Sequence, residues 1–162
     1  MRGSWLGACI FVAVMVAAGF AAWRTVRASV DDTCAVCRRP VHEHSRATGI
    51  VGGRRAVFCC PSCALSQHHQ DGRPVTVTAL TDYATSTRLE PAKAWIVRGS
   101  DVNPCTRQRA LIDADKRAAP MEFDRCSPGL LAFAHRDDAL GFASRHGGTV
   151  LRFTQLAASF TR

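Results

Sequence analysis

The spacing of the cysteines constrains this chain more than any other feature of its sequence. Seven of the eight cysteines lie beyond residue 30, and five of these fall within thirty residues. A C-x2-C pair is followed, after 21 residues, by the first cysteine of the run FCCPSC, and the five residues are Cys34, Cys37, Cys59, Cys60 and Cys63. Two C-x2-C pairs, 34/37 and 60/63, could supply four thiolates to one tetrahedral ion. The spacing therefore predicts a metal site.

The residues around the second pair favour the thiolate form. Pro61 suits the start of a helix that we expect over residues 62–70, and a helix N-terminus lowers the pKa of nearby thiols. Soft thiolates select copper(I) or zinc over hard cations, and we take copper(I) as the leading interpretation and zinc as the alternative. A disulfide framework competes with both, although seven cysteines leave one unpaired. Because Cys59 and Cys60 are adjacent, we expect them to point to opposite faces of a strand, so that only one joins the site, and the sequence leaves open which of the two it is.

The remaining metal-ligand candidates are less well placed. Cys105 and Cys126 lie in an Arg-, Asp- and Pro-rich stretch that we interpret as an insertion loop over residues 103–128. We favour a disulfide that closes this loop, while the alternative is that Cys105 completes a metal site across the two halves of the chain. The other candidates, each more often a surface or loop residue than a ligand, are His42, His44, His68, His69 and Met121.

The N-terminal segment is predicted to be a membrane anchor. Residues 5–23 carry no charge and are flanked by Arg2 and Arg24. A helix of that length just spans the apolar core of a bilayer. A cleaved signal peptide is the alternative, whereas lipid modification of Cys9 is disfavoured because the eight residues before it cannot hold the required apolar stretch. We expect an anchor over residues 1–27 and a globular part outside the cytoplasm.

Beyond the anchor, the chain is predicted to be α+β, with two similar strand-and-helix halves. The spacing of Phe58, Ala64 and Leu65 recurs at positions 133, 139 and 140. The predicted organisation is a cysteine-rich half-domain over 28–80, a connector over 81–92 and a second half-domain over 93–162. The expected elements are helices at 62–70 and 137–146, opening strands at 47–51 and 94–97, short strands ending at 58 and 133, and closing strands at 75–79 and 149–153.

Charge and composition exclude several classes of function. The net charge is +8, but the basic residues are scattered among acidic ones and only 12 aromatic residues occur, so we predict no nucleic-acid partner. The dispersed basic surface fits anionic lipid or an acidic protein partner. The sequence carries neither a clear nucleophile motif nor a carboxylate-rich metal site, and we predict that it is not an enzyme. A thiol-disulfide oxidoreductase using a C-x2-C pair is a third interpretation, ranked last because no βαβ pattern surrounds either pair.

Two parts of the sequence resemble known families. Cys37, Cys59 and Cys63, around GRRAVFCCPSC, resemble the TRASH and YHS-type modules that bind copper and other heavy metals. The segments AWIVRGSDVNPC and LLAFAHRDDALGFASRHGGTVLRF resemble the C-terminal half of the NosL family, copper(I) accessory proteins for nitrous oxide reductase maturation. This resemblance implies a copper(I) ligand at Cys34 or Cys37, and Cys105 stands where the family has a methionine ligand.

These observations lead to one principal hypothesis about function. It is a membrane-anchored, extracytoplasmic copper(I)-binding protein, a metallochaperone or metal-insertion factor, whose partner is a client metalloenzyme or a metal transporter. The alternative is a membrane-tethered interaction module with a structural zinc site. The identity of the metal, and how readily the protein releases it, distinguishes the two hypotheses.

Overall fold

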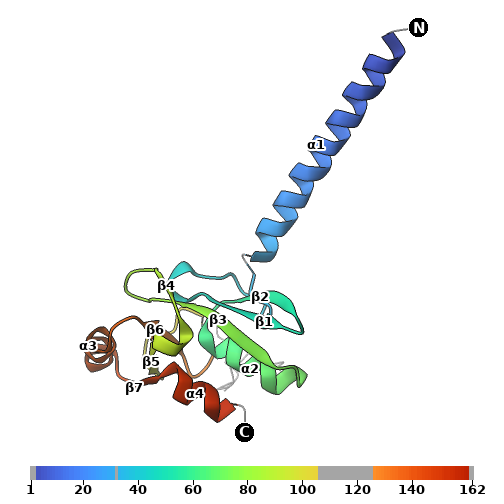
Figure 1. Cartoon of the computed structure of the whole chain (residues 1–162). Helices are drawn as coiled ribbons and strands as arrows, with labels where there is room; N and C mark the ends of the chain where they lie inside the picture. The colour runs from blue at the N-terminus through green and yellow to red at the C-terminus, as the bar shows by residue number, and fades with distance from the viewer. Residues whose placement is uncertain (1–2, 32, 106–125, 161–162) are drawn as a thin grey trace, which may run out of the picture. The chain divides into compact units, whose positions relative to one another are not determined.

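The computed structural model describes residues 3–31, 33–105 and 126–160 and divides the chain into two units, Met1–Asp32 and Thr33–Arg162. The first unit contains a single helix, α1 (Gly3–Asp31), whose side chains at residues 10–26 are exposed (Figure 1). In the portion of the chain that the structure describes, none of the helices is both long enough and apolar enough to cross a bilayer. The predicted transmembrane helix is therefore not supported.

The first half of the second unit is an antiparallel sheet with one main helix. The strand order is β2-β1-β3-β4, so the first strand in sequence lies inside the sheet, between the second and the third. The helix α2 connects β2 to β3. The bounds are β1 (Ala47–Val51), β2 (Arg54–Phe58), α2 (Pro61–Asp71), β3 (Val75–Thr81) and β4 (Arg88–Leu89), with a 3-10 turn η1 (Glu43–Ser45) before β1.

The second half repeats this arrangement. Its sheet has the order β6-β5-β7, again with the first strand in the centre and antiparallel to both neighbours. The helix α3 connects the second strand to the third, as α2 does in the first half (Figure 1). The bounds are β5 (Trp95–Arg98), β6 (Leu130–Phe133), α3 (Arg136–His146) and β7 (Thr149–Arg152). Both halves thus follow the order strand, strand, helix, strand that the sequence predicts.

The structure departs from the predicted elements in two places. Residues 81–92 are not a plain connector, because β4 pairs with β3 through Leu89 and Leu80, and a 3-10 turn η2 (Pro91–Lys93) follows. The closing strand of the second half ends at Arg152, where a helix α4 (Phe153–Phe160) begins. Phe153 and Leu156 are three residues apart and both are buried, so the last apolar residues form one face of a helix rather than the end of a strand.

Asp82 holds the two halves together. It forms a parallel bridge with Ala132 of β6, and the amide of the next residue donates to the Ala132 carbonyl oxygen at 2.8 Å. The Asp82 carboxylate is buried and accepts hydrogen bonds from the Thr85 hydroxyl at 2.6 Å and from the Ala134 amide at 3.4 Å. The buried charged group is therefore satisfied by partners from both halves, and Thr33–Arg162 forms one compact unit.

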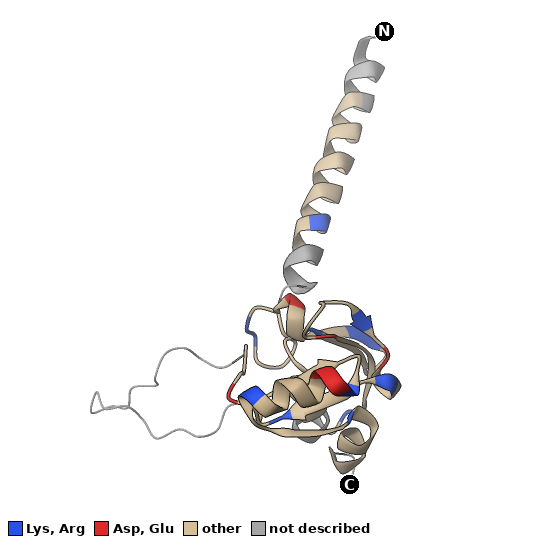
Figure 2. Ribbon diagram, turned by 90° about the vertical axis from the view of Figure 1, so that its left-hand side faces the viewer, with Lys and Arg blue, Asp and Glu red and all other residues tan. Residues whose placement is uncertain are grey.

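Six of the cysteines belong to the main hydrophobic core. This core joins Phe58 and Leu80 of the first half to Ile96 and Leu156 of the second, and a smaller core around Phe133 lies under α3. In the ribbon of Figure 2, the Lys and Arg residues are spread over several elements, and Asp and Glu residues occur among them. The most concentrated chemistry of this unit is therefore the thiols in its interior.

Gly148 provides a test of the second half that does not involve the thiols. Its φ is +98°, and a Cβ at this position would lie 2.9 Å from the Arg98 carbonyl oxygen. We expect Gly148→Ala to lower the free energy of unfolding by roughly 1–3 kcal/mol, because both the backbone conformation and the close approach exclude a side chain. Denaturant unfolding measures this change. The control is Gly141→Ala within α3, where alanine is expected to be neutral or stabilising, and equal effects at the two positions would contradict the structure.

Candidate metal centre

A short closed loop presents the first two thiols. A bridge between its ends closes the loop at residues 33 and 40, and the Cys34 amide donates to the Arg39 carbonyl oxygen at 2.9 Å. An amide within the loop also donates to a carbonyl oxygen of β2 at 2.9 Å. Cys34 is buried, whereas Cys37 is half-buried. The loop thus packs beside β2 with one sulfur inside the core and the other at its edge.

The FCCPSC segment presents the next three thiols. β2 ends at Phe58, the chain bends at Cys59 and Cys60, and α2 follows at once, so that Cys63 lies in the first helical turn. The Ser45 hydroxyl donates to the Cys59 carbonyl oxygen at 2.7 Å and fixes the bend. All three thiols are buried.

The two ends of the insertion bring Cys105 and Cys126 to the same place. The Asn103 side chain donates to the Cys126 carbonyl oxygen at 3.0 Å and accepts from the Cys105 amide at 3.1 Å, so one amide group joins both ends. The Arg39 guanidinium donates to the Cys105 carbonyl oxygen and lies 3.6 Å from the Cys126 sulfur. Both thiols are buried beside the cysteines of the first half.

Seven sulfurs therefore form two groups of four that share one member. In each group all the Sγ atoms lie within 4.8 Å of one another. The first quartet is Cys34, Cys37, Cys59 and Cys63, and the second quartet is Cys59, Cys60, Cys105 and Cys126. Cys59 belongs to both.

The sulfur-to-sulfur distances match metal ligation better than disulfide bonding. The Cys59 sulfur lies 3.4 Å from that of Cys37 and 3.6 Å from that of Cys63. Four sulfurs at about 2.3 Å around one tetrahedral ion would be separated by about 3.8 Å, whereas a disulfide bond measures about 2.05 Å. The observed distances are close to the edges of such a tetrahedron, and all seven cysteines are free thiols.

This arrangement separates two alternatives and corrects two expectations. The sequence leaves open whether Cys59 or Cys60 joins the first site, and the sulfur that lies with those of Cys63 and the first C-x2-C pair is that of Cys59. Cys59 and Cys60 do not point apart, since their sulfurs lie 3.8 Å from each other. The reason is that the strand ends at Phe58, so the alternation of a strand no longer applies at the bend. Finally, the expected disulfide between Cys105 and Cys126 is absent, and both thiols belong to the second quartet instead.

The other candidate ligands lie elsewhere or outside the described residues. His42 and His44 are exposed, and the His44 ring is hydrogen-bonded to the Ser86 hydroxyl at 2.7 Å. The side chains of His68 and His69, and the whole of Met121, fall outside the part of the chain that the structure describes. The metal chemistry of the described residues therefore rests on sulfur.

The packed thiols shift one another's pKa in opposite directions. A hydrogen bond from Cys59 lowers the pKa of the Cys34 thiol to about 2, and one from Cys105 lowers the pKa of Cys126 well below its usual range. The contact with Cys105 raises the pKa of Cys59, and burial raises that of Cys37. Some sulfurs are thus held as thiolates, the form that binds metal, while others keep protons that a metal ion would displace.

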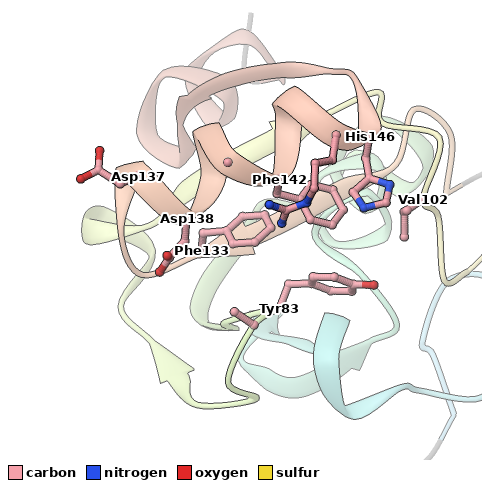
Figure 3. Close-up of a pocket in the computed structure, with 10 residues that line it drawn as sticks. Tyr83, Val102, Phe133, Asp137, Asp138, Phe142 and His146 are labelled. Carbon is pink, nitrogen blue, oxygen red and sulfur yellow. The ribbon is translucent and has the colours of Figure 1, made fainter.

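A concavity of about 480 Å³ lies under α3, and no cysteine lines it (Figure 3). Tyr83 faces Phe142 and His146 across it, and the Tyr83 and Phe142 ring centroids are 5.4 Å apart in an edge-to-face arrangement. His146 pairs with the Asp101 carboxylate at 3.1 Å. Because edge-to-face rings stabilise a core, we interpret this aromatic group as packing of the second half.

Comparison with known proteins places this chain in a family. The family model described as NosL matches residues 25–161. The chain belongs to the NosL family. No curated protein matches it. Among solved structures it is similar to the crystal structure of the copper chaperone NosL from Shewanella denitrificans, with a TM-score of 0.51 and 17% sequence identity over 78% of this chain and 91% of that one. The mixed α/β fold of this chain is thus that of NosL.

Membership of the NosL family confirms the resemblance found in the sequence. The two ligand positions that the resemblance implied, Cys34 or Cys37 in the first half and Cys105 in the second, lie in different quartets. The quartets meet at Cys59, which the resemblance to NosL did not single out but the resemblance to the TRASH and YHS-type modules did, together with Cys37 and Cys63. What the sequence analysis missed is that Cys59 belongs to both quartets; it lies directly after a strand and before a helix, where a bend turns its side chain toward both neighbouring loops.

Proposed function

We propose that this protein is a copper(I) metallochaperone that holds the ion on the first quartet and passes it to a client metalloenzyme or metal transporter. The observation that carries the proposal is a set of four sulfurs at ligand spacing, of which Cys37 alone is half-buried and the other three are buried. Soft thiolates suit copper(I). The similarity of the fold to a copper chaperone supports the same reading.

The geometry suggests how the ion would leave. An incoming thiolate of the client bonds to copper(I) as the bond from Cys37 breaks, and further exchanges move the ion without any change in its oxidation state. Cys37 is the sulfur at the edge of the quartet, so it is the ligand that a client can replace first. The buried Cys34 and Cys63 hold the ion until that exchange has begun.

A structural zinc site is the second candidate, because a tetrahedron of four thiolates suits zinc equally well. The two functions differ in what happens when the metal leaves. A structural zinc ion contributes folding energy, so its removal unfolds the protein, whereas a chaperone must stay folded without its cargo.

The test is removal of the metal from the whole chain, reduced and kept free of oxygen. The copper(I)-loaded protein is challenged with a copper(I) chelator while circular dichroism reports the fold. We expect complete transfer with the fold retained, and faster transfer from Cys37→Ser, which lacks one ligand of the first quartet, than from the matched variant Cys9→Ser in α1. Zinc that co-purifies at one ion per chain, and whose loss unfolds the protein, would refute the delivery role.

The affinity for copper(I) should rise with pH. The pKa of Cys37 is raised by burial and that of Cys59 by its contact with Cys105, so these sulfurs carry protons that the ion must displace. Thiols with a raised pKa stay protonated in the metal-free protein near neutral pH, so copper(I) releases protons when it binds, and each fall in proton concentration favours the metal-bound form. Competition titrations from about pH 6 to about pH 8 should show a steady gain in affinity with proton release. An affinity that does not change over this range would argue against thiolate ligation.

Membrane anchoring and an extracytoplasmic location are part of the proposal. They are supported by the uncharged run over residues 5–23 and by the exposure of large apolar side chains such as Phe11, Val16 and Phe20. Large exposed apolar surfaces mark sites that contact a membrane or a partner. We expect the chain to stay with the membrane fraction after an alkaline wash and to be digested by protease added outside the cytoplasm. Recovery of the intact chain in the soluble fraction would contradict this.

A further inference from the structure

We propose that the second quartet is a metal site in its own right, and that the protein holds two copper(I) ions at once, bridged by the Cys59 sulfur. The inference rests on the proposed function and extends it from one ion to a two-ion centre. The second ion would be bound by Cys60, Cys105 and Cys126 together with the shared Cys59.

The position of the Cys59 sulfur suits a bridge. On the side of the first quartet it lies 3.4 Å from the Cys37 sulfur. On the side of the second it lies 3.8 Å from the Cys60 sulfur and 3.7 Å from the Cys126 sulfur. All three distances are close to the separation of about 3.8 Å expected for two sulfurs on one ion. A thiolate has more than one lone pair, so it can bind an ion on each side.

A second contact joins the quartets. The Cys63 sulfur of the first lies 3.5 Å from the Cys126 sulfur of the second. The seven sulfurs therefore form one continuous group rather than two separate sites. Ions placed in the two quartets would be neighbours, because they would share the Cys59 sulfur as a ligand.

The second quartet is held in place by polar contacts from both halves. Asn103 joins the backbones of Cys105 and Cys126, and Ser45 fixes the Cys59 carbonyl oxygen. The Arg39 guanidinium adds a positive charge 3.6 Å from the Cys126 sulfur. These contacts orient the thiols before any ion arrives, which is the arrangement expected of a binding site.

The charge of the group favours more than one cation. Six of the seven sulfurs are buried, and a buried thiolate without a compensating charge is costly. One monovalent ion among them offsets a single negative charge, and each further cation offsets another. The two ions would also differ in access, because the first quartet includes the half-buried Cys37 whereas every member of the second is buried. We expect the second ion to exchange more slowly.

The experiment is a titration of the whole reduced chain with copper(I) in the absence of oxygen. Native mass spectrometry counts the ions, and X-ray absorption at the copper edge detects a copper neighbour. We expect two ions per chain and a copper–copper signal at the distance that one bridging sulfur allows. Because both measurements use the natural sequence, they do not depend on whether a variant folds.

Cysteine variants then identify the ligands of the second ion. The double change Cys105→Ser and Cys126→Ser should leave one ion and remove the copper–copper signal, while Cys9→Ser should keep two ions. Saturation of the natural chain at one ion would overturn the two-ion centre and leave the chaperone proposal standing. Two ions without a copper–copper signal would overturn the bridge. Copper(I) binding no tighter than that of a free thiol would instead overturn the proposed function itself.

Discussion

Cys59→Ser is expected to weaken copper(I) binding more than any other single cysteine substitution, because Cys59 is the one sulfur that belongs to both quartets. A structural zinc site with four protein ligands binds its ion with about 10–16 kcal/mol, which corresponds to about 2.5–4 kcal/mol for each ligand, and we use the same scale for copper(I). Losing one ligand therefore lowers the affinity roughly 100- to 1000-fold. Competition titrations against a copper(I) chelator measure this loss.

Two matched variants make that test specific. Cys37→Ser removes a ligand of the first quartet only, and Cys60→Ser removes a ligand of the second quartet only. Each substitution should lower the affinity for one copper(I) ion and leave the affinity for the other unchanged, whereas Cys59→Ser should lower both affinities. If Cys59→Ser lowers the copper(I) affinity no more than Cys37→Ser does, the Cys59 sulfur does not bridge two ions.

Phe58→Ala is expected to cause the largest loss of stability in the metal-free protein. The Phe58 side chain is fully buried in the main core, at the end of β2 and immediately before the bend that carries Cys59. Removing a buried phenylalanine ring lowers the free energy of unfolding by about 3–5 kcal/mol, through lost burial and the cavity left behind. Denaturant unfolding of the reduced chain measures the change.

The control is Ile50→Ala in the neighbouring strand. Ile50 of β1 pairs with Arg55 of β2, but its side chain is 44% exposed. We therefore expect Ile50→Ala to lower the free energy of unfolding by about 0.5 kcal/mol or less. Phe58→Ala should also weaken copper(I) binding, since the bend after β2 loses its support. If Phe58→Ala unfolds at the same denaturant concentration as the natural chain, the placement of Phe58 in the core is contradicted.

Much of the fold could be predicted from periodic patterns and stop signals. The Gly-marked ends and the repeated spacing of Phe58 and Phe133 placed a helix between two strands in each half, and the structure has α2 and α3 there. The last helix was missed because only eight residues carry its pattern, and Phe153 fits equally well at the end of a strand. Local patterns therefore located the elements more reliably than their ends.

The membership of the metal centre was harder to predict. The sequence marked five thiols between residues 34 and 63 as one site, but the strand alternation used to separate Cys59 from Cys60 ends one residue too early to apply. Cys105 and Cys126 reach the second quartet because Asn103 joins the ends of the insertion and Arg39 contacts both of them. No spacing in the sequence encodes these contacts, because they depend on how the two halves pack.

The most direct test of the central claim is the affinity of the whole reduced chain for copper(I), measured beside its affinity for zinc and beside an equal concentration of free thiol. The preorganised quartets predict copper(I) binding far tighter than that of the free thiol, with zinc displaced by copper(I) and the fold unchanged. Copper(I) bound no more tightly than by the free thiol, with zinc retained in its presence, would contradict a role in copper delivery.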